Sequence, residues 1–532
     1  MSAMPEISLD QALSRDWNAI VIGAGMGGGL AGRRLAERGL SVLFVEKGPA
    51  GYPTEQQGIL NSLHDPQARL LRGAWPKPAE ARLDGVATRF FGPYGCTVGG
   101  SSVFYAAALE RPERHDLDDR PDMPHPSGGW PVGWDAFLPY FEEAGALLHL
   151  CGTPDPLSPP PPARLSQPPP MSPVDASLKD SMEANGLHPY RLHLAIRTPR
   201  TCRQCFGFKC AHNCKMDGRS AGVVPALQTG RAALLSNCDV REILEMQGRV
   251  EGLRVCKNGQ DAILRAGTYV LAAGALGSPR LLLASRGTHS EGCANSSGWV
   301  GRGLTFHLDE FFVLWPRGAP GGRAGKALSL RDLYAPNGER FGLIQSVGIE
   351  ADYGNIVHYL NQLYDQSPLR RFRRLRHLTR LPALIASRLF GKAALFVGIL
   401  EDYPYPQNRV VLNEDDPEIL TFEYGFNKEL LARRRRFRRA ILRAFRGHRR
   451  FLVSMRPVLN YGHPAGTLRF GNDPDNSVLT PDCRAHDLAN LYVADASFMP
   501  SALGVNPSLT IAANALRVAD IIAERTRKGE AS

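Results

Sequence analysis

The last seventy residues of the chain hold two side chains suited to acting on a small molecule. His463 lies in YGHPAGTLRFG (461–471), and Asn506 lies in VNPS (505–508), just before a long apolar stretch. A neutral imidazole accepts a proton readily near neutral pH because its unperturbed pKa is about 6.5. A carboxamide nearby can hold a substrate oxygen by a hydrogen bond. The pair therefore indicates acid–base catalysis, with a purely structural histidine as the alternative for His463.

The elements next to this pair are expected to hold it at the end of a buried sheet. A short apolar strand is predicted at Leu491–Ala494, and a polar turn with Asp495 and Ser497 follows it. A long apolar helix then begins near Asn506. A strand, a turn and a helix in this order predict an active site that is closed by the tail of the chain.

A glycine-rich turn near the start of the chain predicts a bound dinucleotide. A strand at Ala19–Ile22 leads into a GxGxxG pattern formed by Gly23, Gly25 and Gly28. Such glycines permit a tight turn, close approach of a pyrophosphate and close helix packing, and the helix N-terminus offers N–H groups to phosphate. A second strand, Ser41–Val45, ends at Glu46, which is placed to bind ribose hydroxyls. An acid at this position argues against a 2′-phosphate and hence against NADP.

Further pieces of a nucleotide-binding sheet are scattered through the chain. Strands are predicted at Val250–Val255 and Thr268–Ala272, and the second leads into a glycine turn and a helix, which is the pattern of a nucleotide-binding sheet. A second loop that can offer N–H and hydroxyl groups to a phosphate consists of Gly99, Gly100, Ser101 and Ser102. We therefore expect a discontinuous nucleotide-binding domain made of residues 15–120, 200–305 and 455–530. A second, substrate-binding domain is expected from residues 121–199 and 306–454.

The composition permits a large cytoplasmic enzyme. The 532 residues are 43% hydrophobic, which is enough for more than one domain. Residues 1–17 are polar and include acidic side chains, so we expect no export signal. The most apolar run, Leu381–Leu400, is interrupted by Arg388 and Lys392, so we expect no membrane-spanning helix. Ten cysteines in a chain of this length predict reduced thiols or metal ligands rather than a disulfide scaffold.

Two arginine-rich segments, 369–390 and 433–450, carry much of the net charge of +11. In the first segment, leucine and phenylalanine alternate with arginine, which predicts an amphipathic surface helix. Such basic helices could give peripheral contact with an anionic membrane or an acidic protein, and the alternative is a solvated helix face. We expect no nucleic-acid partner because no nucleic-acid-binding motif accompanies the charge.

In their order along the chain, these motifs resemble the glucose–methanol–choline (GMC) oxidoreductase family of FAD enzymes. The resemblance runs from the glycine pattern with Glu46, through GGSS (99–102), Trp130–Pro131 and AAGALGSPRLL (272–282), to HPAGT (463–467), ADAS (494–497) and NP (506–507). It implies an α/β fold with a discontinuous Rossmann-like FAD-binding domain. It also implies a second α+β domain, which binds substrate and is built on an antiparallel sheet.

The resemblance also implies a reaction. His463 would take the hydroxyl proton of a CH–OH group while a hydride passes to flavin N5, and Asn506 would be the second catalytic residue. The cofactor contacts that it implies are Val240 near the adenine, and Asp495, Ala496 and Pro507. His307 is interpreted as structural.

The residues after GGSS bear on how the flavin is attached. Some family members with covalent flavin have His shortly after this loop, whereas this chain has Val103–Phe104–Tyr105. We therefore expect FAD to be bound non-covalently.

A cysteine-rich segment, TCRQCFGFKCAHNCK (201–215), adds a second candidate centre. Four thiolates so close in sequence can hold an iron–sulfur cluster or a tetrahedral zinc, and the alternative is a cysteine-rich loop without metal. The segment resembles that of cluster-bearing bacterial GMC dehydrogenases of sugars, except that theirs begins with adjacent cysteines. The candidate ligands are Cys202, Cys205, Cys210 and Cys214.

The cysteine segment also decides which electron acceptor is expected. With a cluster, the enzyme is a dehydrogenase that passes electrons to a cytochrome, a quinone or a small subunit. Without a cluster, the enzyme could be an oxidase that passes electrons to oxygen. A non-redox flavin-dependent lyase is a third alternative. The substrate has no recognisable signature in 306–454; a sugar or glycoside is expected first by resemblance, and another alcohol second.

Overall fold

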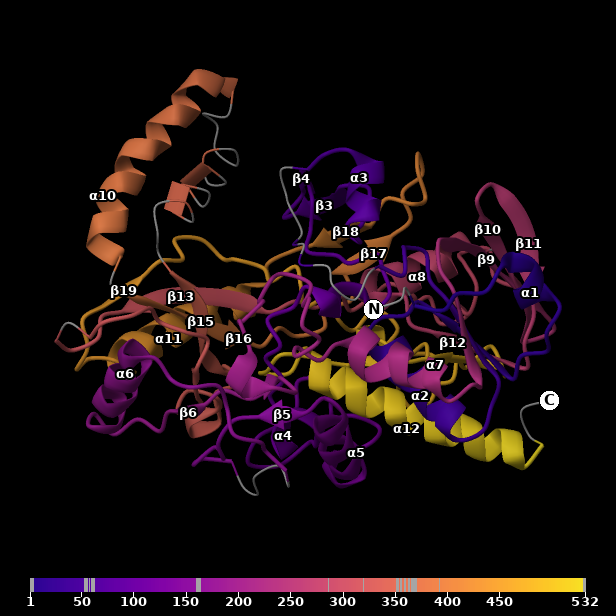
Figure 1. Ribbon diagram of the computed structural model, residues 1–532, viewed down its shortest axis with the longest axis horizontal. Coiled ribbons are helices and arrows are strands. Elements are labelled where there is room, and N and C mark those ends of the chain that lie inside the picture. Colours follow the sequence, from indigo (N-terminus) through magenta and orange to yellow (C-terminus); the bar gives the residue numbers. More distant parts are fainter. Residues whose placement is uncertain are drawn as a thin grey trace.

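The computed structural model consists of two main sheets, each with helices packed on it, and further small sheets between and beside them (Figure 1). In Figure 1 the antiparallel sheet lies on the left, and the long C-terminal helix runs along the lower edge. The structure describes residues 4–51, 56, 58, 63–158, 164–285, 287–318, 320–350, 354, 356–357, 360–361, 364, 371–391 and 393–529.

A parallel sheet forms the core of one half of the molecule. Its strands are β1 (Ala19–Ile22), β2 (Val42–Val45), β8 (Ala232–Leu235), β12 (Thr268–Leu271) and β20 (Leu491–Val493). They lie in the order β20–β12–β1–β2–β8, and every pair is parallel. β1, β2, β12 and β20 are buried throughout, which explains their continuous apolar sequences. The expected Rossmann-like sheet is confirmed.

Helices α2 (Met26–Glu37) and α12 (Ser508–Arg527) pack against each other and against this sheet. Close contact requires glycine on α2: a Cβ on Gly32 would lie 2.3 Å from the Phe44 ring. Helix α5 (Trp134–Leu147) packs against α12 and shares the same core, although the sequence-based division places it in the second domain.

An antiparallel sheet of six strands forms the other half. Its strands are β6 (Tyr190–Arg191), β13 (Leu308–Leu314), β14 (Leu328–Leu330), β15 (Ile344–Glu350), β16 (Ala394–Leu400) and β19 (Arg450–Leu452). They lie in the order β19–β13–β16–β15–β14–β6. Helix α11 (Lys428–Ala444) packs on this sheet, with the Phe437 ring against Gly398. The antiparallel sheet implied by the resemblance is therefore present.

A smaller sheet crosses the predicted domain boundary. It consists of β3 (Ala79–Leu83), β4 (Val86–Phe90), β17 (Arg409–Val411) and β18 (Thr421–Tyr424), in the order β17–β18–β3–β4. β18 pairs with β3 over four residues. Segments 79–90 and 409–424 thus share a sheet although the sequence assigns them to different domains, and the exact domain limits stay a prediction.

The remaining elements are short or peripheral. The helices are α1 (Leu9–Leu13), α3 (Pro66–Leu71), α4 (Arg114–Leu117), α6 (Pro173–Glu183), α7 (Val224–Gln228), α8 (Gly274–Ala284) and α10 (Arg380–Phe390). The strands are β5 (Leu150–Cys151), β7 (Leu194–Ala195), β9 (Cys238–Met246), β10 (Arg249–Lys257) and β11 (Gln260–Leu264). Over the residues that the structure describes, no helix combines the length and apolar character needed to cross a bilayer. All ten cysteines are free thiols.

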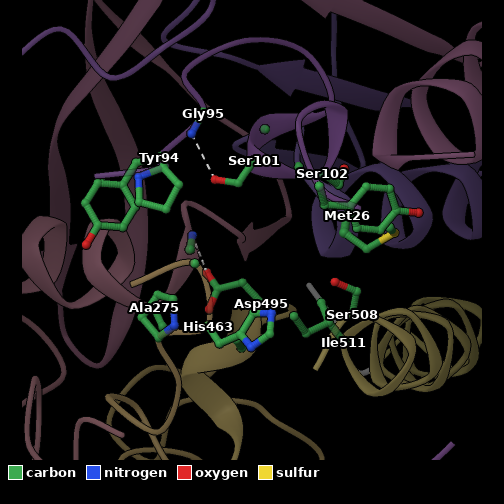
Figure 2. A pocket seen from close by; sticks show the side chains of 18 of the residues that line it. Met26, Tyr94, Gly95, Ser101, Ser102, Ala275, His463, Asp495, Ser508 and Ile511 are labelled. Carbon is green, nitrogen blue, oxygen red and sulfur yellow. Dashed lines mark hydrogen bonds between the residues drawn. The ribbon is translucent and has the colours of Figure 1, made fainter. Parts of the chain in front are cut away.

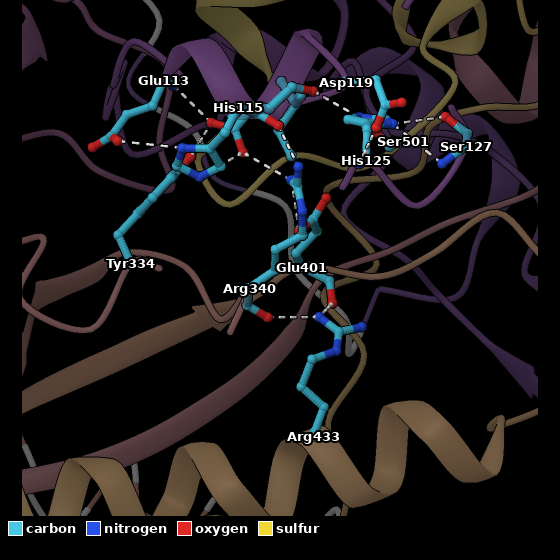
Figure 3. A network of polar contacts seen from close by, with 12 residues as sticks. Glu113, His115, Asp119, His125, Ser127, Tyr334, Arg340, Glu401, Arg433 and Ser501 are labelled. Atoms are coloured by element: carbon cyan, nitrogen blue, oxygen red, sulfur yellow. Dashed lines mark hydrogen bonds and ion pairs between the residues drawn. The ribbon is translucent and has the colours of Figure 1, made fainter. Parts of the chain in front are cut away.

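Buried charges fix the antiparallel sheet and α11 against α4 (Figure 3). Arg433 donates to the backbone oxygens of Arg340 and Glu401, at 3.1 and 2.6 Å. The Arg340 guanidinium lies 3.7 Å from the Glu401 carboxylate and 3.9 Å from that of Asp116. Tyr334 donates to Asp116 at 2.6 Å. Arg340 thus lies beside two buried carboxyl groups, so removing Arg340 would take the nearby positive charge from both.

Candidate active site

A cavity of about 490 Å³ lies where the two halves meet. It is lined by residues that follow β1, β2 and β12, and by side chains of β13, β15 and β16. Figure 2 shows Tyr94, Gly95 and Ser101 on one side of it and His463 and Asp495 on the other. The carboxyl ends of parallel strands are where α/β sheets bind their ligands.

Most of the residues that the sequence selects line this cavity. They are Gly23, Gly25, Glu46, Gly100, Ser101, Ser102, Val240, His463, Asp495, Ala496, Asn506 and Pro507. Gly28 and Gly99 are not among its lining residues, and neither are the four cysteines. Gly28 serves packing instead, because a Cβ there would lie 2.0 Å from Gly23 O. Gly99 has a φ of +95°, which places the turn before Gly100.

The first part of the cavity is formed by backbone and fits the ADP half of a dinucleotide. The α2 N-cap residue is Gly25, which has no side chain to cap the helix, so the first N–H groups of α2 are available to a phosphate. Gly100 approaches Gly25 so closely that a Cβ on Gly100 would lie 3.0 Å from Gly25 Cα. Both glycine turns thus meet at one point of the cavity wall.

Glu46 is fixed at the end of β2 by two backbone groups. Its carboxylate accepts hydrogen bonds from Ala24 N and Gly48 N, each at 2.9 Å. Burial raises the pKa of Glu46, while these two N–H groups oppose that change. The carboxylate retains further acceptor positions, which suits the hydroxyls of a ribose.

The serines of the GGSS loop also hold the loop itself. Ser101 Oγ accepts from Gly95 N at 2.9 Å, and Ser102 Oγ accepts from Gly218 N at 2.9 Å while donating to Gly99 O. Ser102 therefore has its hydroxyl proton engaged, and Ser101 has the freer hydroxyl for a phosphate.

Asp495 joins two elements at the cavity wall. Its carboxylate accepts from Gly274 N at 2.8 Å and from Ser278 Oγ, both in α8, and from Ser497 N at 2.9 Å. Burial raises the pKa of Asp495, and these donors oppose the shift. The side chain thus joins the start of α8 to the turn that follows β20.

His463 forms a hydrogen-bonded pair with His307. His307 Nε2 lies 3.0 Å from Leu503 O, and a carbonyl oxygen only accepts, so this nitrogen carries a proton. His307 Nδ1 is then an acceptor, and His463 Nδ1 donates to it at 2.9 Å. His463 Nε2 is consequently the unprotonated nitrogen, available to a ligand in the cavity. His307, interpreted from sequence as structural, thus sets the tautomer of His463.

Both imidazoles are neutral near pH 7. Burial lowers the pKa of His463 well below its usual range, and the nearby His307 and Lys326 lower it further. Burial also lowers the pKa of His307 to about 4. A neutral His463 with a free Nε2 is a proton acceptor.

Asn506 contributes an unpaired acceptor to the same site. The residue is 7% exposed, and its Oδ1 has no hydrogen-bond partner. A buried polar atom without a partner costs free energy, so this oxygen is placed for a ligand rather than for the fold.

The polar residues of the cavity that were not selected from the sequence include Asp309, Lys326 and Gln345. Asp309 accepts from Asn460 Nδ2 at 3.0 Å through one oxygen, and its Oδ1 and Gln345 Oε1 are unpaired. Burial raises the pKa of Asp309 to about 7 and lowers that of Lys326 to about 8. They lie on or next to strands of the antiparallel sheet with no local motif, so only the fold shows that they converge.

The four cysteines lie together beside the cavity rather than in it. Cys205, Cys210 and Cys214 are buried with Cys202 packed against them, and the sulfurs of Cys210 and Cys214 are 3.4 Å apart. In the part of the chain that the structure describes, no three His, Cys, Asp or Glu side chains are arranged to hold a metal ion. The thiols gather as the spacing predicts, but the arrangement does not support an iron–sulfur cluster or zinc.

The fold and the cavity together fit a dinucleotide-binding protein with a neutral histidine at its cavity. Comparison with known families places it further: two family models, both described as GMC oxidoreductase, match residues 20–309 and 404–515. The chain belongs to the GMC oxidoreductase family, which oxidises alcohol groups with FAD, and the glycine turns and Glu46 fit that cofactor.

Relatives match over nearly the whole chain. Paromamine 6'-oxidase of Streptomyces fradiae is 28% identical, covering 96% of this chain and 92% of its own. The 2-methyl-1,2-propanediol dehydrogenase of Mycolicibacterium austroafricanum is 26% identical, covering 96% and 95%. The solved pyridoxine 4-oxidase from Mesorbium loti has the same fold, with a TM-score of 0.62 at 20% identity over 96% of this chain and 99% of that one.

Proposed function

We propose that this protein oxidises a CH–OH group of a sugar-like substrate, with His463 taking the hydroxyl proton and an acceptor other than oxygen receiving the electrons. The observation that carries the proposal is the His307–His463 pair, which leaves an unprotonated Nε2 at the cavity. A base with a pKa below neutrality is unprotonated near pH 7, which is the state that a proton acceptor needs.

The residues present fit non-covalently bound FAD. Gly23, Gly25 and Glu46 would hold its ADP part, and Asp495 and Ala496 would lie along the rest. In the loop after GGSS, Phe104 and Tyr105 line the cavity. Neither is a histidine, the residue that would be expected to form a covalent link to the flavin. When bound, FAD supplies the acceptor for the hydride of the substrate carbon.

The chain's own residues orient the substrate and move its proton. His463 Nε2 takes the proton of the reacting hydroxyl, and the proton on Nδ1 stays engaged with His307. Asn506 Oδ1 accepts a hydrogen bond from the substrate and so limits its orientations. Because Asn506 is buried and His463 is partly buried, they act with reduced competition from water.

A polyhydroxylated substrate matches the polar groups on the β13–β15 side. Asp309 Oδ1 and Gln345 Oε1 are buried acceptors without partners, and Lys326 is a buried donor. Several hydroxyls on one small molecule would satisfy them together. The names of two relatives, one acting on paromamine and one on a propanediol, agree with a hydroxylated substrate.

The name of one relative, a dehydrogenase, agrees with an acceptor other than oxygen, and the cysteine loop lies beside the cavity. Lys215 donates to the backbone oxygens of Val103 and Tyr105, each at 3.0 Å, and to that of Cys205 at 3.1 Å. The four thiols therefore sit directly behind the segment that lines the cavity. An oxidase is the alternative, favoured by the name of the first relative above.

The test is anaerobic bleaching of the flavin by sugars, amino sugars and short diols. Bleaching by a hydroxylated substrate in the wild type supports the proposal, and its absence with all of them contradicts it. The acceptor is tested separately by comparing reduction of a dye with oxygen consumption. Oxygen uptake as fast as dye reduction would favour an oxidase, and an iron assay on anaerobically purified protein tests whether the thiols hold a cluster.

A further inference from the structure

An exposed segment rich in arginine and large apolar residues lies outside the cavity. It consists of residues 371–391, and we call it the basic arm. It consists of a 3₁₀ helix, Arg373–Thr379, followed by α10. In Figure 1, α10 stands away from the sheets at the upper left. Residues 369 and 370 of the predicted amphipathic segment lie outside the described residues.

The basic arm turns its large apolar side chains toward solvent. Seven of the sixteen exposed large apolar side chains of the described residues lie between 372 and 389. They are Phe372, Leu375, Leu378, Leu381, Leu384, Ile385 and Leu389, each 41–66% exposed. Their spacing of three or four residues places most of them on one side of a helix. A water-soluble helix normally buries such a stripe.

The opposite face of α10 carries small side chains. Ala383 is buried, and Ala386 and Ser387 are partly buried, at helical spacing from one another. The exposed stripe of large apolar side chains, which we call the aliphatic stripe, is therefore distinct from the face of α10 that packs inward, which carries Ala383, Ala386 and Ser387. The large residues are left for an external partner.

The end of the arm is anchored firmly to the antiparallel sheet. Trp315, which follows β13, donates from Nε1 to Leu389 O at 3.3 Å and packs its ring on Phe390 at 5.7 Å. Phe390 also contacts the ring of Phe451 in β19 at 5.6 Å, and Phe451 is itself 50% exposed. The apolar stripe thus continues onto the body of the protein.

The positive charge of the basic arm indicates that its partner is anionic. Residues 371–391 contain six arginines and no acidic residue. Five of these arginines are exposed beside the aliphatic stripe, at positions 371, 374, 376, 380 and 388. Long basic side chains can reach anionic headgroups while aliphatic ones enter the acyl boundary, which is the pattern of helices that lie in a membrane interface.

We propose that the basic arm docks this protein on the surface of an anionic lipid bilayer. The arm is inserted in the chain between β15 and β16, and both strands line the cavity. Docking would therefore hold the substrate side of the cavity near the membrane surface. An acidic protein and a second copy of this chain are the competing occupants of the same stripe.

The test is flotation of the full-length holoenzyme with phosphatidylcholine vesicles, with or without phosphatidylglycerol. We expect binding that requires phosphatidylglycerol and weakens in high salt. The double variant Leu381→Glu/Ile385→Glu should reduce binding about tenfold or more, since it removes apolar contact and adds negative charge. Arg374→Ser/Arg380→Ser should weaken the preference for anionic vesicles, because two of the six arginines are lost.

The matched control is Val86→Glu/Met246→Glu, which alters exposed apolar residues on other sheets. It should bind vesicles as the wild type does, and flavin content per chain verifies folding of every variant. No vesicle binding by the wild type, or equal loss in the control, overturns the proposal. So does sedimentation velocity that shows a wild-type dimer reduced to a monomer by the Leu381→Glu/Ile385→Glu change.

Discussion

The two ends of the cavity are built in different ways. The nucleotide end is mostly backbone: glycine turns, the first N–H groups of α2, and one carboxylate, Glu46, held by two N–H groups. The substrate end is made of side chains, with His463, Asn506 and Asp309 coming from three distant segments. A backbone cradle needs particular residues at fixed local spacing, whereas a side-chain pocket needs only that the fold bring suitable groups together.

The two ends should therefore fail in different ways when altered. A change at the nucleotide end meets rigid backbone and should reduce stability and cofactor content. A change at the substrate end meets a side chain that the fold does not need, and should reduce catalysis in a folded, flavin-loaded protein.

The largest effect is expected at the base. His463→Gln should lower the rate of anaerobic flavin reduction by about 10²- to 10⁴-fold, because Nε2 no longer takes the proton. Flavin content and melting temperature should stay near the wild-type values. The rate is measured by stopped-flow absorbance, with the exposed His188→Gln as the control. A rate within twofold of the wild type would rule His463 out as the base.

At the nucleotide end, Gly27→Ala should act on stability instead. A Cβ on Gly27 would lie 1.8 Å from Ala494 O, so α2 and the end of β20 must separate. We expect a loss of about 1–3 kcal/mol in the free energy of unfolding, together with a lower flavin content. Denaturant titration measures the first quantity. Gly321→Ala, where no atom lies within 4 Å, is the control, and equal losses in both variants would contradict the argument.

The role of His307 lies between these two cases because it acts through His463. His307→Leu removes the acceptor for His463 Nδ1 and should slow flavin reduction on the order of tenfold, with the acid limb of the pH profile displaced. His307→Asn, whose Oδ1 can accept the same hydrogen bond, should recover part of the rate. If both variants have the same pH profile as the wild type, the tautomer argument fails.

The smallest effect is expected at Asp309. Burial raises its pKa to about 7, so the carboxyl is neutral below that pH and becomes a carboxylate beside Lys326 above it. KM should fall by less than about tenfold as pH rises through 7, because the ionised form is the stronger acceptor. Asp309→Asn should remove this dependence, and Asp239→Asn at the nucleotide end should keep it.

The same shift makes a separate prediction for stability. The folded protein holds the Asp309 proton more tightly than the unfolded chain does, so this contribution is complete below about pH 4 and is lost as pH rises to about 7. Thermal melts of wild type and Asp309→Asn should therefore diverge with increasing pH over that range. Parallel curves would mean that the carboxyl ionises as it does in the unfolded chain.

A feature of the fold can be predicted from the sequence when it depends on residues that are close together along the chain. The strands predicted at Ala19–Ile22 and Thr268–Ala272 are confirmed, the second ending at Leu271, because a continuous apolar run beside a glycine turn strongly favours a buried strand. The domain limits stay a prediction: β3 and β18 pair across the predicted boundary, and α5 packs on α12. Such pairings join segments hundreds of residues apart, and no local pattern marks them.

The sequence by itself determined the family, the nucleotide cradle and the candidate base, since each is a short motif whose residue types are dictated by backbone geometry or proton affinity. Only the tertiary structure decided that His307 fixes the tautomer of His463, and that Asp309 and Gln345 point unpaired acceptors into the cavity. It also decided that the aliphatic stripe of the basic arm faces outward. These features depend on which segments the fold brings together and which face of a helix it buries. The linear pattern of apolar and charged residues does not specify either.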